Sequence, residues 1–342
     1  MIKKIKEDTV KWGILGVGDV CEVKSAPAMQ FLAQSALVAV MRRNGAKAKD
    51  YANRHKVSKW YDQAEDLIQD PEVNAIYIAT PPYAHEELTL KAAQAGKPVY
   101  VEKPMATTFA ACKRMIAACE QSEVPLYVAY YRRMLPNFLY LKQLIDSGAI
   151  GEIRLVKIDL YQSIDPAIVT DAAKQSSVNW RINPAIAGGG YFYDLAAHQL
   201  DYLDYVFGPI QTATGYAANQ AGLYEAADIV TGNFTFKNGI QGIGSWCFTV
   251  DKSAEQDTMT IIGSKGKLTI SFFGAPEIRL EKSDSKQSEL LQFSLPHHIQ
   301  EPLIQTIIND LLGKGICPST GITAARTNRV MEEMTKSFYS KP

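Results

Sequence analysis

Three side chains of this 342-residue chain have the chemistry to move a proton: Lys103, Asp194 and His198. Histidine titrates near neutral pH, and a partly desolvated lysine can have a lowered pKa that lets it exchange a proton there. Asp194 and His198 are four residues apart, so on a helix both project from one face and the aspartate can orient the histidine. Taken alone, this spacing favours an ion pair or a satisfied core histidine, and Lys103 alone favours a surface lysine beside a turn.

A glycine turn near the start of the chain has the pattern of a dinucleotide-binding turn. The apolar run Val10–Leu15 ends directly in Gly16, and a helix is predicted from about Asp19. Gly16 permits the tight turn, and Gly18 lets the backbone approach a pyrophosphate at the helix N-terminus. Cys21 stands where the full fingerprint has a third glycine. A purely structural turn is the alternative, and the flanking strand and helix favour the dinucleotide.

Two arginines follow the second predicted strand, where an acidic residue would bind the ribose hydroxyls of NAD. Arg42 and Arg43 occupy this place instead. Guanidinium groups suit a 2′-phosphate, so NADP(H) is the preferred cofactor and NAD(H) the second choice. The alternative is a pair of solvated surface charges.

Strands and helices alternate through the first part of the chain, which predicts a parallel sheet covered on both faces. Pro27 is expected to break and restart the first helix. The predicted strands are Val10–Leu15, Ala36–Met41, Val73–Ala79, Pro98–Val101 and Pro125–Tyr130. The predicted helices begin at about Asp19, cover Lys47–His55, include Leu67 and Ile68, and span Glu86–Ala95 and Phe109–Ser122.

An ordered set of short strings resembles the glucose–fructose oxidoreductase/inositol dehydrogenase family (Gfo/Idh/MocA). The strings are Thr80-Pro81-Pro82 with His85, Ala95-Gly96-Lys97-Pro98, Val101-Glu102-Lys103-Pro104, Arg132-Arg133-Met134-Leu135-Pro136, Ser147-Gly148-Ala149-Ile150-Gly151, and Gly188-Gly189-Gly190 with Asp194 and His198. The resemblance spans nearly the whole chain, and its most specific part is the glutamate–lysine–proline string after a strand. Tyr131 departs from the pattern, because many relatives have asparagine there.

The resemblance implies an α/β fold with two domains. Residues 1–128 would form a Rossmann domain with a doubly wound parallel sheet. Residues 129–342 would form an α+β domain with a large, open, mostly antiparallel sheet, one face of which serves subunit contact. The last helix, about 321–339, would pack back toward the first domain. The β-rich runs agree with this second sheet: Ile153–Tyr161, Thr212–Tyr216, Ile229–Phe236, Ile240–Val250, Asp257–Ile262 and Lys267–Phe273.

The resemblance also implies roles for individual residues. Lys103, Asp194 and His198 would be catalytic, and the choice between Lys103 and His198 as proton acceptor stays open. The expected cofactor-binding residues are Gly16, Gly18, Asp19, Val20, Arg42, Arg43, Thr80, Pro81, Pro82, His85, Glu102 and Lys103. The expected substrate-binding residues are Lys103, Arg132, Trp180, Arg181, Asp194 and His198. Arg132 and Arg133 fit a contact with the cofactor or substrate and a salt bridge between domains equally well, and Trp180 fits the domain core as well as a sugar pocket.

Three functions fit these residues. The first is an NAD(P)-dependent dehydrogenase or reductase that transfers a hydride between nicotinamide and a carbinol or carbonyl carbon of a sugar, cyclitol or related polyol. The second is a nicotinamide-dependent glycosidase that oxidises its substrate transiently. The third is a non-catalytic NADP-binding sensor or regulator. A homodimer or homotetramer through the C-terminal sheet is expected.

Composition and charge argue against several other classes. Lysine plus arginine and aspartate plus glutamate each number 36, so the formal net charge is zero and gives no electrostatic reason to expect nucleic acid or an anionic membrane. The five cysteines form no CxxC pair and have no metal-ligand spacing, so we expect reduced thiols, no metal and a cytoplasmic protein. No stretch approaches the roughly 20 apolar residues of a membrane helix, and no signal peptide is expected.

Overall fold

The computed structural model of the chain describes residues 4–164, 180–283 and 288–339. The chain divides into two compact units, which are described separately. Unit 1 contains residues 1–133 and 296–325, and unit 2 contains residues 134–295 and 326–342.

Unit 1 is built on a six-stranded parallel sheet with the order β3-β2-β1-β4-β5-β6. The strands are β1 (Val10–Leu15), β2 (Ser35–Met41), β3 (Lys59–Tyr61), β4 (Ala75–Ile78), β5 (Val99–Val101) and β6 (Leu126–Val128). The predicted doubly wound parallel sheet is confirmed. The strand order reverses beside β1, whose neighbours are β2 and β4, and open α/β sheets bind ligands at the carboxyl ends of strands at such a point.

Strand β3 is the one strand of this sheet that the sequence patterns did not predict. It has three residues, lies at the sheet edge and pairs with β2, and its Trp60 side chain is exposed. An edge strand of this length has too few buried positions to produce a readable alternation.

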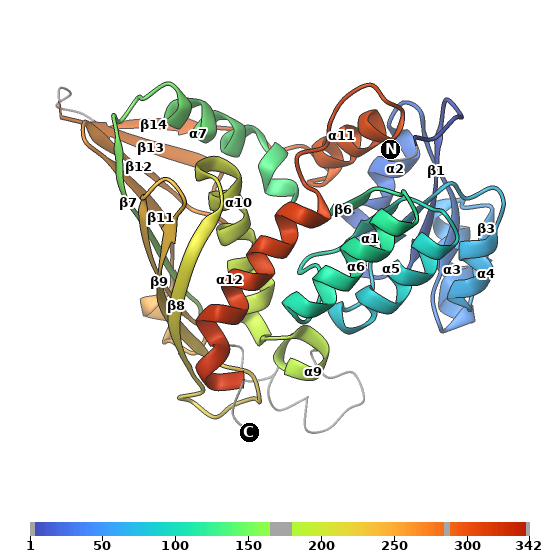
Figure 1. Cartoon of the computed structure of the whole chain (residues 1–342), viewed down its shortest axis with the longest axis horizontal. Helices are drawn as coiled ribbons and strands as arrows, with labels where there is room; N and C mark the ends of the chain where they lie inside the picture. Colours follow the sequence, from blue (N-terminus) through green and yellow to red (C-terminus); the bar gives the residue numbers. More distant parts are fainter. Residues whose placement is uncertain (1–3, 165–179, 284–287, 340–342) are drawn as a thin grey trace. The chain divides into compact units, whose positions relative to one another are not determined.

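Helices cover both faces of the unit 1 sheet (Figure 1). They are α1 (Asp19–Val23), α2 (Ala26–Phe31), α3 (Gly45–His55), α4 (Ala64–Gln69), α5 (His85–Gln94), α6 (Phe109–Gln121) and α11 (Glu301–Leu311). The predicted break at Pro27 is confirmed, because this proline lies in the first turn of α2, where its missing N–H is tolerated.

The segment 296–325 belongs to unit 1. The sequence predicts one boundary near residue 128, with all later residues in the second domain. The N–H of Val128 donates to Ser319 O at 3.1 Å, and the Ser319 hydroxyl donates to Val128 O at 2.7 Å. Tyr127 forms an isolated antiparallel bridge with Thr320. These bonds pair the end of β6 with a segment about 190 residues later, a long-range contact that no local pattern reveals.

Unit 2 is built on an eight-stranded sheet with the order β14-β13-β12-β11-β7-β10-β9-β8. The strands are β7 (Ile153–Tyr161), β8 (Ile210–Ala218), β9 (Ile229–Phe236), β10 (Gln241–Cys247), β11 (Gln256–Gly263), β12 (Gly266–Ile270), β13 (Glu277–Lys282) and β14 (Glu289–Gln292). Every neighbouring pair is antiparallel except β7 with β10. The predicted mostly antiparallel sheet is confirmed, with β13 and β14 as additions.

The α-helices of unit 2 lie on one face of its sheet (Figure 1). They include α7 (Pro136–Asp146), α9 (Pro184–Ala187), α10 (Ala197–Phe207) and the part of α12 (Gly321–Tyr339) from residue 326 onward. On β7, Ile158 and Leu160 are buried whereas Lys157 between the strand's apolar positions is exposed. The period of two shows that one face carries the core of this unit.

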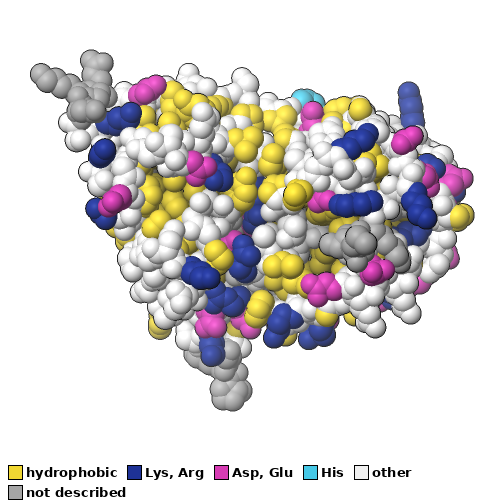
Figure 2. Space-filling view, turned by 45° about the horizontal axis from the view of Figure 1, so that its top comes forward, with side chains coloured by type: hydrophobic (Ala, Val, Ile, Leu, Met, Phe, Trp, Pro, Cys, Tyr) yellow, Lys and Arg dark blue, Asp and Glu magenta, His cyan; other side chains and the backbone are white. Residues whose placement is uncertain are grey.

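Polar and apolar groups are distributed as in an ordinary globular protein. Figure 2 shows acidic and basic side chains interspersed over the visible face rather than gathered by sign. The five cysteines are unpaired, and four of them are buried. Within the described ranges, no helix is both long and apolar enough to cross a bilayer.

Candidate functional site

The glycine turn links the carboxyl ends of three neighbouring strands. The N–H of Gly16 donates to Met41 O, the last residue of β2, at 2.9 Å. Gly16 has a φ of +91°, and a Cβ there would lie 2.6 Å from Thr80 Cγ2 and 3.0 Å from the Thr80 nitrogen. Glycine is therefore required by both conformation and space, because Thr80, two residues after the end of β4, lies against the turn.

Gly18 has a different environment. It is the N-cap of α1 in an extended conformation, with a φ of −144°. Among the described residues, a Cβ at Gly18 would meet no atom closer than Gly16 O at 4.0 Å. The backbone at the start of α1 thus faces open space, which fits the close approach of a dinucleotide pyrophosphate.

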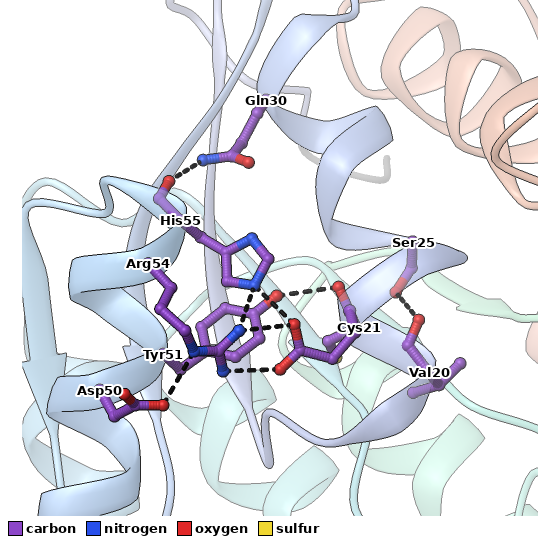
Figure 3. A network of polar contacts seen from close by, with 9 residues as sticks. Val20, Cys21, Ser25, Gln30, Asp50, Tyr51, Arg54 and His55 are labelled. Carbon is purple, nitrogen blue, oxygen red and sulfur yellow. Dashed lines mark hydrogen bonds and ion pairs between the residues drawn. The ribbon is translucent and has the colours of Figure 1, made fainter.

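Helix α1 has five residues and is held by contacts from α3 (Figure 3). The Tyr51 hydroxyl donates to Cys21 O at 2.8 Å. Arg54 donates to both oxygens of Glu22, at 2.8 and 3.0 Å, and the His55 Nε2 lies 2.6 Å from Glu22 Oε2. A bidentate guanidinium–carboxylate pair fixes geometry as well as charge. His55, to which the sequence assigned no role, therefore helps Tyr51 and Arg54 to hold helix α1 and the glycine turn in place. We call these three residues of α3 the α3 clamp.

Two titratable groups of α1 are shifted by this environment. Hydrogen bonds from Arg54 lower the pKa of Glu22 to about 2, despite the opposing effect of burial. Burial raises the pKa of the Cys21 thiol to about 12. Cys21 is thus an inert packing residue at the third glycine position, and Glu22 stays ionised through the physiological range.

The two arginines follow β2 at the same edge of the sheet. Arg42 is half-buried and Arg43 is exposed, and the Arg42 N–H donates to Tyr61 O at 3.2 Å. Within the described part of the chain, neither guanidinium forms a salt bridge. The next residue, Asn44, caps α3 by accepting the Lys47 N–H at 3.1 Å. Both positive charges therefore stay available to an anionic group beside the glycine turn.

His85, which the sequence predicts to contact the cofactor, has its ring against three backbone carbonyls. The side chain is fully buried. Its Nε2 lies 2.7 Å from Thr80 O, and its Nδ1 lies 3.1 Å from Pro104 O and 3.2 Å from Met105 O. Desolvation lowers its pKa. The ring ties the loop after β4, which includes Pro81 and Pro82, to the loop that follows Lys103.

Glu102 and Lys103 directly follow β5, at the same edge as the glycine turn. Lys103 is half-buried, and Glu102 is 8% exposed. Glu102 accepts the Tyr77 hydroxyl at 2.7 Å, the side-chain amide of Gln300 at 2.7 Å and the N–H of Lys103 at 3.2 Å. The sequence assigned nothing to Tyr77 or Gln300, since an apolar strand residue and a distant glutamine give no local signal.

Asp194 and His198 lie in unit 2, where the structure corrects the helix predicted for them. Residues Phe192–Ala196 form a π-helical turn, and α10 begins only at Ala197. The turn follows Gly188–Gly190, in which Gly190 has a φ of +65°. π-Helical turns occur frequently at functional sites, because they redirect a side chain at the cost of regular hydrogen bonding.

Trp180 and Arg181 lie beside this turn. Arg181 Nε donates to Asp194 Oδ2 at 3.1 Å, and its guanidinium lies 4.4 Å from the centre of the Trp180 ring. The His198 side chain is 4% exposed, and its ring centre lies 6.2 Å from that of Phe273. Three of the predicted substrate-binding residues are thus brought into direct contact, with His198 one turn of helix beyond Asp194.

Arg132 and Arg133 are both buried in unit 1. Arg132 donates to the Tyr131 hydroxyl at 2.8 Å, and its guanidinium lies 5.0 Å from the centre of that ring. Arg133 donates to Pro318 O at 2.5 Å. Arg133 thus holds the segment 296–325 against the end of β6.

No group of acidic, histidine or cysteine side chains in the described residues is arranged to hold a metal ion.

Two family profiles match the amino-acid sequence of the chain. Residues 10–130 match the oxidoreductase family with an NAD-binding Rossmann fold, and residues 138–269 match the GFO/IDH/MocA C-terminal domain. Oxidoreductase P35 of Formosa agariphila is 37% identical to the chain over 326 residues, which cover 95% of this chain and 98% of that protein. The chain belongs to the Gfo/Idh/MocA family of oxidoreductases.

Other similar proteins share less of the sequence of this chain. The trans-1,2-dihydrobenzene-1,2-diol dehydrogenase of Bos taurus is 27% identical over 75% of this chain and 72% of its own length. The structure of levoglucosan dehydrogenase in complex with NADH and levoglucosan superposes with a TM-score of 0.85 at 20% identity, covering 96% of this chain and 97% of that one. This structural likeness shows that the two proteins share a fold.

Proposed function

We propose that this oxidoreductase is an NAD(P)-dependent dehydrogenase or reductase that acts on a carbinol or carbonyl carbon of a sugar, cyclitol or related polyol. The single observation that supports a bound dinucleotide best is the open space at Gly18, beside a glycine turn at the strand-order reversal. The substrate class is supported by the similar proteins named levoglucosan dehydrogenase and trans-1,2-dihydrobenzene-1,2-diol dehydrogenase, whose names give a sugar derivative and a diol as substrates.

The cofactor would be held by the carboxyl-end loops of unit 1. Gly16, Gly18 and the first turn of α1 would hold the pyrophosphate, and Glu102 would contact the nicotinamide ribose. When bound, the nicotinamide supplies a hydride acceptor or donor. NADP(H) is the preferred form, because Arg42 and Arg43 have no acidic partner among the residues that the structure describes and suit a 2′-phosphate.

Lys103, Asp194 and His198 are proposed to handle the substrate and its proton. Lys103 Nζ and the His198 imidazole are the two candidates that take the hydroxyl proton during oxidation. Asp194 would orient the substrate, with its carboxylate held by Arg181. General acid–base catalysis of this kind is worth about 10²–10⁴ in rate. Trp180 and Arg132 complete the proposed substrate-binding set.

The chain is also proposed to form a homodimer or homotetramer through the face of the unit 2 sheet that carries no α-helix among the described residues. Side chains on this face include Tyr216, Thr231 and Ile243, which are exposed. The exposed apolar side chains of Tyr216 and Ile243 on this face, which also carries Lys157 opposite Ile243, are suited to self-association.

The function is tested by screening sugars, inositols and vicinal diols for a change in nicotinamide absorbance with both cofactors. Lys103→Met and His198→Asn should each lower kcat at least tenfold and leave the cofactor Kd within about twofold. Lys113→Met and His297→Asn, at exposed positions, are the matched controls.

Three results would contradict parts of this proposal. Full turnover in Lys103→Met or His198→Asn removes that residue from the mechanism. Cleavage of a glycoside with no net change in the cofactor identifies the transient-oxidation glycosidase instead. Cofactor binding without turnover of any compound in the screen favours a regulator.

A further inference from the structure

His85 is a fully buried side chain with carbonyl oxygens at both of its ring nitrogens. It is the first residue of α5. Its Nε2 lies 2.7 Å from Thr80 O, on the loop after β4. Its Nδ1 lies 3.1 Å from Pro104 O and 3.2 Å from Met105 O, on the loop that follows Lys103. The ring therefore lies between two loops at the carboxyl ends of β4 and β5, the edge of the sheet where the dinucleotide is proposed to bind.

A neutral imidazole has one N–H, so only one of these two loops can receive a hydrogen bond from the ring. Burial lowers the pKa of His85, so the ring is neutral at about pH 8. The contact with Thr80 is the shorter one, and 2.7 Å is the length of an N–H···O hydrogen bond. The lone pair of an unprotonated Nε2 would face the Thr80 oxygen at that distance and be repelled by it. These distances place the proton on Nε2, which donates to Thr80 O.

Thr80 in turn lies against the glycine turn. The N–H of Ala79 donates to Leu15 O at 2.8 Å, and the next residue of each segment is Thr80 or Gly16. A Cβ on Gly16 would lie 2.6 Å from Thr80 Cγ2. Any movement of Thr80 would therefore change the surface that the turn offers to a dinucleotide.

The hydroxyl of Thr80 also indicates a ligand beside the glycine turn. Its Oγ1 is buried and has no hydrogen-bond partner among the described residues. A buried hydroxyl without a partner costs free energy, and most such groups in native proteins are satisfied. A polar atom of a bound dinucleotide would satisfy this one.

We propose that His85 is a positioning residue of the dinucleotide site: it holds Thr80 beside Gly16 through a hydrogen bond from Nε2. The inference rests on the proposed function, in which the cofactor lies against the glycine turn. The ring is fully buried, so His85 acts through the position of the Thr80 hydroxyl rather than by contact with the cofactor.

The first test locates the proton of His85 in the full-length protein without cofactor. The ring nitrogens of the five histidines are labelled with ¹⁵N, and a long-range ¹H–¹⁵N correlation spectrum at about pH 8 shows which nitrogen of each ring is protonated. The signals that disappear in His85→Gln belong to His85. We expect a proton on Nε2 and none on Nδ1.

The second test uses substitutions that keep one nitrogen position at a time. The amide of glutamine reaches the position of Nε2 and that of asparagine the position of Nδ1, whereas leucine has no donor at either. We expect His85→Leu and His85→Asn to raise the Kd for NADPH at least about fivefold, and His85→Gln to keep it within about twofold of wild type. Thr89→Val is the matched control, because it removes another buried hydroxyl of α5 that has no partner among the described residues, and it should leave the Kd unchanged.

A double-mutant cycle shows whether His85 acts through Thr80. Thr80→Val keeps the shape of the side chain and removes the hydroxyl, so it should raise the Kd for NADPH by itself. In that background we expect His85→Leu to raise the Kd by less than about twofold, because the group that His85 positions is already gone. A purely structural effect of His85→Leu would be as large in the Thr80→Val protein as in the wild type.

Each outcome decides the proposal. A proton on Nδ1 alone overturns it, as does a His85→Gln protein that binds NADPH as weakly as His85→Leu. Equal effects of His85→Leu with and without the Thr80 hydroxyl also overturn it. If the wild-type protein binds neither NADPH nor NADH, the proposed function fails, and the ¹⁵N spectrum still decides whether His85 holds Thr80.

Discussion

Replacing Gly18 with alanine is expected to separate cofactor binding from folding. The backbone at Gly18 is extended, with a φ of −144°, a conformation that alanine adopts freely. No atom of the described residues lies within 4.0 Å of the added methyl group apart from Gly16 O at that distance. The free energy of unfolding should therefore stay within about 0.5 kcal/mol of wild type.

The same methyl group would fill the space in which the pyrophosphate is proposed to approach the backbone. We expect the cofactor Kd to rise at least about tenfold, which corresponds to about 1.4 kcal/mol. Fluorescence titration of NADPH and NADH measures this change directly, and it needs no knowledge of the substrate.

Gly16→Ala is the contrasting variant, because its methyl group would meet protein atoms. A residue with a φ of +91° costs about 1–2 kcal/mol when it has a Cβ. The contact at 2.6 Å with Thr80 Cγ2 adds about 1–3 kcal/mol of overpacking. A loss of about 2–5 kcal/mol should lower Tm by roughly 4–20 °C, measured by circular dichroism without cofactor.

Two results would refute this reasoning. One is a Gly18→Ala protein that binds both cofactors as tightly as wild type, which would place the dinucleotide elsewhere. The other is a Gly18→Ala protein that unfolds at as low a temperature as Gly16→Ala, which would show that the space at Gly18 is filled.

Three further predictions concern other parts of the chain. Arg42→Asp should raise the Kd for NADPH relative to that for NADH, and an unchanged ratio would contradict the assignment of NADP(H). Because the folded-state pKa of Glu22 is lowered to about 2, its contribution to stability is present above its unfolded pKa and is lost as the pH falls through about 2. Glu22→Gln should thus lower the free energy of unfolding by about 1 kcal/mol at pH 7, a value that is reduced because Glu22 is partly exposed. Equal urea midpoints of variant and wild type at that pH would argue against a stabilising role for the contacts between Glu22 and the α3 clamp. Ile243→Lys should shift the molar mass measured by light scattering toward that of the monomer. The control Ile316→Lys, at a position in unit 1 that is 87% exposed, should leave the mass unchanged. An unchanged mass in Ile243→Lys would exclude the open sheet face as the contact between subunits.

The sequence by itself determined the elements with strong local patterns. The runs that predicted Val10–Leu15, Ile153–Tyr161 and Ile229–Phe236 agree with β1, β7 and β9 at both ends. The glycine turn, the break at Pro27 and the family were also readable, because each depends on residue types at fixed short spacings. Such signals survive without knowledge of tertiary contacts.

Tertiary structure decided the features that depend on distant partners. The pairing of Val128 with Ser319, the hold of Gln300 on Glu102 and the edge strand β3 have no local signature. The π-helical turn that contains Asp194 also departs from the regular helix that its four-residue spacing to His198 suggested. Hydrogen bonds between residues far apart in the chain stabilise these features, and local residue patterns do not encode which distant segments will meet.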